Sequence, residues 1–182
     1  MTTLLRSRVA PLVAGVLIAG TFGAAGVLAV VPSGHITYSG GALVATKVAT
    51  DEDGWASSAI DTWQTVTGSS LSVTVPSGTT RLVTGHFIAE SYCTGDAAWC
   101  SVRIVARKQG GTTIYEFRPR VGNDFAFDEP SDEDYEGNSV SRTFGLPNGT
   151  WNVWVQAMVV GGTSGTAMYL DDWHFEVDVF KP

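Results

Sequence analysis

The sequence predicts an all-β fold, with about eight strands arranged as an antiparallel two-sheet β-sandwich. After residue 31, no stretch repeats apolar residues at the three- and four-residue spacing of an amphipathic helix. Short runs of alternating apolar and polar residues recur instead, separated by turn residues rich in Gly, Pro and Ser. The last run, residues 167–180, has one apolar face formed by Trp173, Phe175, Val177 and Val179. This alternation is typical of an antiparallel sheet that is buried on one side.

The N-terminal segment predicts export. Arg6 and Arg8 precede 23 uncharged residues, and Val27-Leu28-Ala29 offers the kind of site that a signal peptidase cuts. We therefore expect a helical signal peptide over residues 1–29 and a secreted, extracellular protein. An uncleaved membrane anchor is the alternative, since roughly 20 apolar residues span a bilayer. Gly and Ala make up 10 of the 21 residues from Val9 to Ala29, which favours cleavage because both insert weakly.

The rest of the chain is predicted to form a flexible leader, residues 30–41, and one β domain, residues 42–182. Turn sequences such as Pro76-Ser77-Gly78, Gln109-Gly110-Gly111 and Leu146-Pro147-Asn148-Gly149 separate the expected strands. In chain order, the strands are expected at residues 42–50, around Trp63, and at 71–75, 81–91, 100–108, 112–118, 140–144, 150–160 and 167–180.

The only two cysteines, Cys93 and Cys100, have six residues between them. An oxidising compartment would join them in a disulfide that pins a loop between two strands. A redox or metal pair is the alternative, but such pairs usually have Cys-x-x-Cys spacing or histidine neighbours, which this segment lacks. We therefore expect a structural disulfide.

The charge balance limits the partners. The chain carries 11 basic and 18 acidic residues, and loss of the basic Arg6 and Arg8 with the signal peptide would change the net charge from −7 to −9. This excess of negative charge argues against nucleic acid and against an anionic membrane surface as partners. The sequence contains no Gly-x-Ser-x-Gly or His-Glu-x-x-His motif, so we expect no catalysis, although a glycosidase-like pair of carboxylates stays open.

The acidic stretch 124–136 is the candidate metal site, because Ca²⁺ binds the carboxylate and carbonyl oxygens of flexible loops. The candidate ligands are Asp128, Asp132, Asp134 and Glu136. The last three match the start of an EF-hand loop, but Thr143 stands where the closing glutamate of that loop belongs. The alternative is a solvated acidic loop. We expect no other cofactor.

A basic patch lies just upstream of the acidic stretch. It consists of Arg103, Arg107, Lys108, Arg118 and Arg120. We expect this patch to pair with the acidic stretch. An anionic cell-wall polymer or acidic glycan is the alternative partner.

The six tryptophans suggest a glycan ligand, because sugar rings stack on exposed indoles. Trp151 and Trp154 are three residues apart in an expected strand, so they point to opposite faces, and Trp154 is displayed if Trp151 is inward. The candidate ligand-binding residues are Trp154 with its neighbours Asn152 and Gln156, together with Trp55 and Trp99 in turn-rich segments. The alternative is that these large side chains fill or seal the core.

The segments "FGLPNGTWNVWVQA" (144–157) and "LDDWHFEVDVF" (170–180) resemble the last strands of jelly-roll-like β-sandwich modules. The segment "SYCTGDAAWCSVRI" (91–104) is similar to a disulfide-pinned loop of secreted proteins from high-GC Gram-positive bacteria. This resemblance implies a jelly-roll-like fold for about residues 42–182. It implies a fold more than an activity, since such folds host unrelated functions.

We therefore expect a secreted, non-catalytic binding module for carbohydrate or cell-wall polymer. The alternative function is a structural or assembly protein of the extracellular surface, stabilised by calcium.

Overall fold

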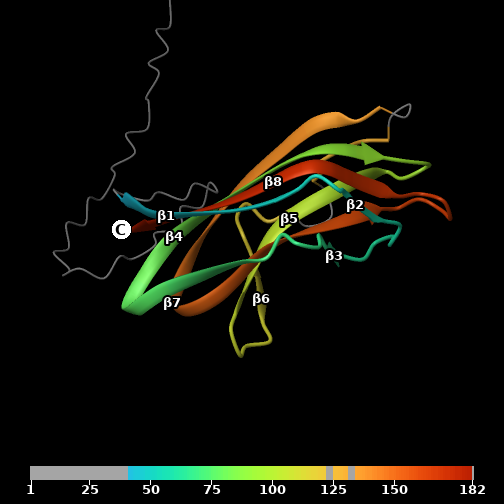
Figure 1. Ribbon diagram of the computed structural model, residues 1–182. Coiled ribbons are helices and arrows are strands. Elements are labelled where there is room, and N and C mark those ends of the chain that lie inside the picture. The colour runs from blue at the N-terminus through green and yellow to red at the C-terminus, as the bar shows by residue number, and fades with distance from the viewer. Residues whose placement is uncertain (1–40, 122–124, 131–133, 182) are drawn as a thin grey trace, which may run out of the picture.

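The computed structural model describes residues 41–181 except 122–124 and 131–133, and all its regular elements are strands (Figure 1). They are β1 (Ala42–Asp51), β2 (Trp55–Ser57), β3 (Gln64–Thr65), β4 (Leu71–Cys93), β5 (Trp99–Lys108), β6 (Ile114–Glu116), β7 (Glu136–Val160) and β8 (Met168–Lys181). The all-β prediction is confirmed for these residues. The predicted signal peptide and nearly all of the predicted leader lie outside them.

The described part of the chain contains no helix with the length and apolar character needed to cross a membrane.

The eight strands belong to one antiparallel sheet rather than to two separate sheets. The main order is β1-β8-β4-β7-β5-β6, with β2 also paired to β8 and β3 to β7. The long strands β4 and β7 pair with each other over most of their length, from Leu71 opposite Val153 to Ser91 opposite Glu136. They therefore link the β1-β8 side of the sheet to the β5-β6 side.

Two predicted turns lie inside these long strands. The turn at 76–78 interrupts the pairing of β4 only locally, as a register shift between Val75 and Thr80. The turn at 146–149 lies opposite it in β7, because Val75 faces Gly149 and Thr80 faces Pro147. The pairing of β4 with β7 therefore continues on both sides of this irregularity. The expected strands 71–75 and 81–91 are both part of β4, and the expected strands 140–144 and 150–160 are both part of β7.

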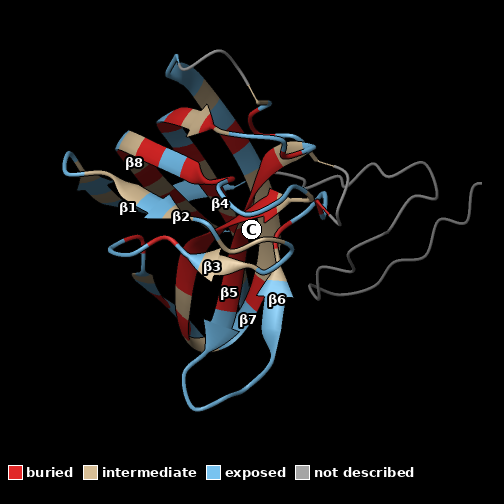
Figure 2. Ribbon diagram, turned by 90° about the vertical axis from the view of Figure 1, so that its right-hand side faces the viewer, coloured by how far each residue is buried: buried red, intermediate tan, exposed pale blue. Residues whose placement is uncertain are grey.

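The sheet curls so that strands that do not pair share one core. A Cβ added to the buried Gly85 of β4 would lie 3.0 Å from Ile104 Cδ1 of β5 and 3.3 Å from Phe175 Cε2 of β8. Phe87 packs beside Phe175 and Trp173, with ring centroids 6.4 Å and 6.1 Å away. The predicted apolar face of the last strand is buried here, and Figure 2 shows its alternation with more exposed residues. Burial of this apolar surface is the main force that holds the curled sheet together.

The predicted disulfide is present between Cys93, the last residue of β4, and Cys100 of β5. Both cysteines are fully buried. Asp96, in the loop between them, accepts hydrogen bonds from the Thr163 amide at 2.8 Å and the Thr163 hydroxyl at 3.1 Å. These bonds, the amide's first, lower the pKa of Asp96. The loop is therefore fastened at both ends and in its middle.

Candidate functional site

Three tyrosines from three neighbouring chain segments form a row on the outer face of the sheet, here called the tyrosine row. Tyr169 of β8 lies directly opposite Tyr92 of β4. Tyr135 immediately precedes β7, whose first residue, Glu136, faces Ser91. The Tyr92 ring centroid is 5.8 Å from that of Tyr169, in a stacked arrangement, and 5.7 Å from that of Tyr135.

The strand alternation explains why the rings of Tyr169 and Tyr92 face outward. Met168 and Leu170 are buried on either side of Tyr169, and Ser91 and Cys93 are buried on either side of Tyr92. Since successive strand residues point to opposite faces, these two tyrosines must point away from the core. The two outer members of the row, Tyr169 and Tyr135, are 38% and 48% exposed.

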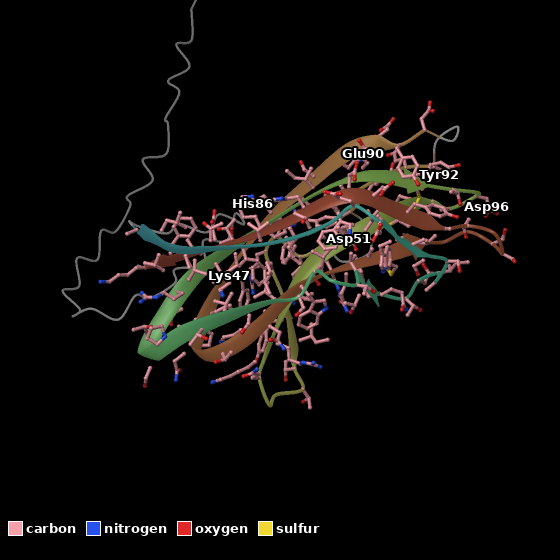
Figure 3. All side chains as sticks on the ribbon, viewed as in Figure 1. Lys47, Asp51, His86, Glu90, Tyr92 and Asp96 are labelled. Atoms are coloured by element: carbon pink, nitrogen blue, oxygen red, sulfur yellow. A yellow bond between two sulfur atoms is a disulfide. The ribbon has the colours of Figure 1, made fainter. Side chains whose placement is uncertain are left out.

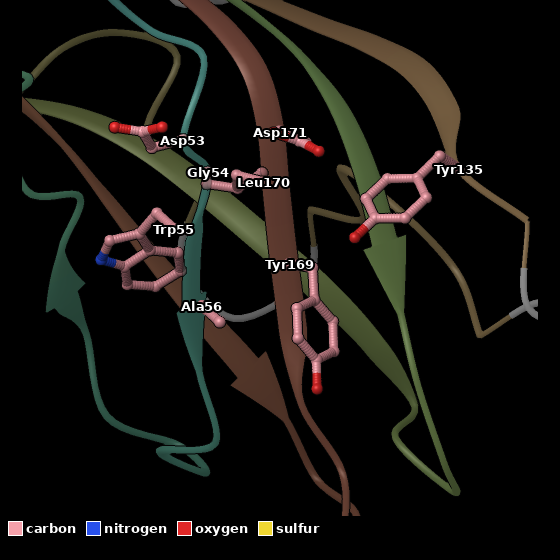
Figure 4. A pocket seen from close by; sticks show the side chains of 8 residues that line it. All are labelled: Asp53, Gly54, Trp55, Ala56, Tyr135, Tyr169, Leu170 and Asp171. Carbon is pink, nitrogen blue, oxygen red and sulfur yellow. The ribbon is translucent and has the colours of Figure 1, made fainter.

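A hollow of about 210 Å³ lies beside the tyrosine row, and its lining residues are shown in Figure 4. The lining consists of Asp53, Gly54, Trp55, Ala56, Tyr135, Tyr169, Leu170 and Asp171. Gly54 lies in the break between β1 and β2 and has a φ of +78°, which glycine adopts without strain. A Cβ on Gly54 would lie 3.1 Å from Asp171 Oδ1. Glycine thus lets the backbone approach this carboxylate closely.

A β-bulge in β8 places Asp171 at the hollow. Ile88 of β4 faces His174 and Glu90 faces Asp171, so two residues of β8 lie between those pairs where β4 has one. Asp172 occupies the bulge with a φ of +43°, and its amide donates to Asp171 Oδ1 at 3.0 Å. Bulges redirect side chains in this way and are frequent beside binding sites. The bulge also keeps both Leu170 and Trp173 in the core despite their odd spacing.

The hollow is acidic. Asp53 and Asp171 line it, and the described lining includes no basic side chain. Glu90 lies near Tyr92 on β4 (Figure 3). Burial raises the pKa of the Tyr135 phenol, and the negative charges of Asp171 and Glu90 raise it further. Tyr135 is therefore a neutral hydroxyl at physiological pH, able to donate a hydrogen bond as well as accept one.

Trp55 lines the hollow without presenting its ring to the tyrosines. It lies opposite the buried Leu170 on β8, so both side chains point to the inner face of the sheet. The Trp55 side chain packs against the core, and its indole points away from Tyr169 and Tyr135 in Figure 4. The Trp55 ring is therefore not placed to stack on a ligand in the hollow. The aromatic rings that are placed to do so belong to Tyr169 and Tyr135.

Trp154 lies on the predicted face of β7 but is covered. Trp151 is buried in the core, and Trp154 points to the opposite side, as the three-residue spacing predicts. However, Trp154 is only 8% exposed, and the Arg107 guanidinium carbon lies 5.7 Å from its ring centroid. Asn152 on the same face is half-buried. The Trp154 indole, which was predicted to be exposed on the sheet face, is therefore packed against its neighbours.

Gln156, the second residue that was predicted to bind a ligand beside Trp154, is hydrogen-bonded to Arg103. Its Oε1 accepts hydrogen bonds from Arg103 Nε at 2.9 Å and Nη2 at 2.7 Å. Arg103 also pairs with Glu116, with 3.4 Å between Nη1 and Oε2, and its guanidinium carbon lies 4.2 Å from the Trp63 ring centroid. Burial lowers the pKa of Arg103, and the charge of Glu116 opposes this effect. These contacts indicate a structural network.

Arg103, a member of the basic patch, pairs with Glu116, which lies outside the acidic stretch. Asp124, Asp132 and Glu133 of that stretch fall outside the described residues. Trp99, the remaining candidate, is half-buried at the start of β5 opposite Val160. Neither Trp99 nor Arg103 lines the hollow beside the tyrosine row.

The predicted metal ligands are only partly brought together. Asp128 is buried and Glu136 is exposed, and both line a second hollow of about 390 Å³ with Glu129 and Asn138. Asp134 is exposed and lies outside this lining, whereas Asp132 falls outside the described residues. Within the described residues, no group of three or more His, Cys, Asp or Glu side chains is arranged to hold a metal ion.

Comparison with known proteins yields no matching family model and no matching curated relative. The geometry of the tyrosine row and its hollow is therefore the basis for a functional assignment. Sequence reasoning selected tryptophans and passed over Tyr92, Tyr135 and Tyr169. The sequence pattern does indicate that Tyr169 and Tyr92 point outward, because each lies between residues that are buried. Their alignment with each other depends on the register between β4 and β8, which are far apart in the sequence.

Proposed function

We propose that this chain is an exported, non-catalytic β domain that binds a glycan on the tyrosine row. The observation that carries the proposal is the alignment of three phenol rings across adjacent strands, with the outer two well exposed. Aromatic rings bury large apolar areas at low entropic cost, and the apolar face of a sugar ring is a suitable partner. The adjacent carboxylate of Asp171 can accept hydrogen bonds from sugar hydroxyls.

The charges around the site favour a neutral or amine-bearing glycan over an acidic one. Asp53 and Asp171 line the hollow, and the whole chain has a net charge of −7. An acidic polymer would be repelled both locally and at long range. The cell-wall polymer of this proposal is therefore a polysaccharide without phosphate or carboxylate groups.

Export and a sandwich-like fold are part of the same proposal. The uncharged N-terminal segment supports cleavage after Ala29, and the disulfide between Cys93 and Cys100 suits an oxidising compartment. The contact between β5 and the β4-β8 side supports a jelly-roll-like sandwich built by curling one sheet. Such a sandwich supplies a rigid outer face, which suits a preorganised binding platform.

A glycan array probed with the mature chain tests the function. Tyr169→Ala removes an exposed ring of the row, and Tyr115→Ala removes a ring of similar exposure, 40%, on the distant β6. We expect Tyr169→Ala to weaken binding about tenfold and Tyr115→Ala to leave it unchanged, since one aromatic contact contributes about 1 kcal/mol or more. The absence of any glycan ligand, or equal effects of the two variants, would overturn the proposal.

A second candidate function, self-assembly, is favoured by the exposed edge of β1. Among the described residues, β1 pairs through one edge with β8, and its Leu43, Val44 and Val48 are exposed. An exposed apolar edge strand is a template for pairing with another chain. Light scattering after size-exclusion chromatography should then show oligomers that Val48→Lys disperses, and a monomer at all concentrations would exclude this candidate.

A further inference from the structure

The tyrosine row is one end of a longer surface on the outer face of β4 and β8, here called the outer strip. The register of the two strands pairs its residues level with each other, and their neighbours along each strand are buried. From Thr84 to Tyr92 the strip is about 27 Å long, at about 3.3 Å per residue. Its members are Thr84, His86, Ile88, Glu90 and Tyr92 of β4, and Tyr169, Asp171, His174, Glu176 and Asp178 of β8.

Ile88 places apolar surface in the middle of the outer strip. It is 51% exposed, although β4 is a central strand that pairs with β7 on one edge and with β8 on the other. His174 of β8 and Ser139 of β7 lie directly opposite it, so polar groups flank the exposed aliphatic side chain on both sides. Ile88 is four residues from Tyr92, or about 13 Å along the strand, which is farther than a single sugar ring spans.

The outer strip carries an excess of negative charge. Four of its ten residues are acids, whereas its two histidines are its only basic residues. One histidine, His174, lies with Nε2 3.7 Å from Glu176 Oε2. Among the described residues, those that pair with the strip from β1 and β7 on the same face are uncharged: Thr46, Val48, Thr50, Gly137, Ser139, Ser141 and Thr143. A surface of this kind attracts cations and repels anions.

The negative charge reaches the tyrosine row itself. Glu90 and Asp171 lie opposite each other, two residues along β4 and β8 from Tyr92 and Tyr169. Figure 3 shows Tyr92, Glu90 and His86 following one another along this face. Burial raises the pKa of the Tyr135 phenol, and the charges of Asp171 and Glu90 add to this effect. Aromatic faces and carboxylates are thus next to each other, and both attract an ammonium group.

We propose that the ligand is a linear amino-sugar polymer with free amines, and that its chain runs from the tyrosine row along β4 and β8 over Ile88. This inference rests on the proposed function and names its ligand. Sugar rings stack on the exposed tyrosines and pack on Ile88, while ammonium groups along the chain pair with Glu90, Asp171 and Glu176. A second copy of this chain is a poorer occupant, because two acidic strips repel each other.

Calorimetric titration at low ionic strength, where charges are weakly screened, tests this inference. The probes are a dimer and a hexamer of glucosamine, and the hexamer of N-acetylglucosamine, which has the same length without the charge. We expect the glucosamine hexamer to bind about tenfold more tightly than either of the other two, because exposed ion pairs are individually weak and add up along the chain.

The outcomes separate this inference from the function on which it rests. Equal affinity for the two hexamers would overturn the cationic ligand, and equal affinity for the glucosamine dimer and hexamer would overturn the path along the strip. Either result, with glycan binding intact, leaves the proposed function standing. Failure of every oligomer here and of every glycan on the array would overturn both.

Two matched pairs of variants locate the chain on the outer strip. Ile88→Thr should weaken binding of the glucosamine hexamer about fivefold, whereas Ile114→Thr, at a 44% exposed position on β6, should not change it. Threonine suits a strand, so both proteins should keep the wild-type Tm. Glu176→Gln should weaken hexamer binding about threefold, and Glu129→Gln, an exposed acid outside the strip, should leave it unchanged. Equal effects within both pairs would refute the assigned path.

Discussion

Replacing Gly85 with alanine tests whether strands that do not pair share one core. The added Cβ would lie 3.0 Å from Ile104 Cδ1, 3.1 Å from Ile104 Cγ2 and 3.3 Å from Phe175 Cε2. These distances are a few tenths of an ångström shorter than ordinary contacts, so the Ile104 side chain must move. Overpacking of a core typically costs about 1–3 kcal/mol, and we expect about 1–2 kcal/mol here because the end of Ile104 can rotate.

Urea and thermal denaturation of four proteins measure this effect: the wild type, Gly85→Ala, Ile104→Val and the double variant. The single Gly85→Ala change should lower Tm by about 3–6 °C. Ile104→Val alone should cost about 0.5–1.5 kcal/mol, because it leaves a small cavity. In the double variant, the lost Cδ1 makes room for the new methyl group, so the two costs should fall short of additivity by at least about 0.5 kcal/mol. Full additivity, or a Gly85→Ala protein as stable as the wild type, would refute contact between β4 and β5 across the core.

Three further changes probe the site and its supports. Gly54→Ala should lower the unfolding free energy by about 1 kcal/mol because of its φ of +78°, and should weaken glycan binding by narrowing the hollow; unchanged glycan affinity would remove the hollow from the site. Arg103→Lys should cost about 1–3 kcal/mol in chemical denaturation, since lysine cannot reproduce the two bonds to Gln156; a variant as stable as the wild type would show that the network is dispensable. Thr163→Val removes the hydroxyl bond to Asp96, so NMR titration should show the pKa of Asp96 moving part of the way back up towards 3.8. Because the folded-state pKa of Asp96 lies below its unfolded value, its bonds stabilise the protein above about pH 4, and this contribution disappears as the pH falls through the folded-state pKa. The variant should therefore lose less stability on acidification, and an unchanged Asp96 pKa would contradict this reasoning.

The sequence predicted the parts of the fold that depend on local pattern. The alternation around Trp173 and Phe175 identified the inner face of β8, and the presence of just two cysteines in a chain expected to be exported predicted the disulfide. The division into strands failed at 76–78 and 146–149, because residues that usually form turns lie opposite each other in two paired strands. That pairing is a long-range property, and neither segment shows it alone.

The candidate site could not be predicted for a similar reason. The direction of Trp154 follows from its spacing to Trp151 in the sequence, but its burial involves Arg107 of β5, whose position beside it depends on the pairing of β5 with β7. The tyrosine row exists only because the registers of β8 and β4 bring Tyr169 and Tyr92 opposite each other. A bulge at Asp172 then adds a carboxylate that simple alternation would have placed differently.

NMR of the protein with labelled tyrosine rings, titrated with the glycan selected by the array, tests the central claim most directly. The chain has five tyrosines. Among the described residues, Tyr115 is the tyrosine that lies outside the tyrosine row. Binding on the tyrosine row predicts that the ring signals of Tyr92, Tyr135 and Tyr169 shift together with one Kd while the Tyr115 signal stays in place. A titration that moves the Tyr115 signal and leaves the three row signals unchanged would contradict the account.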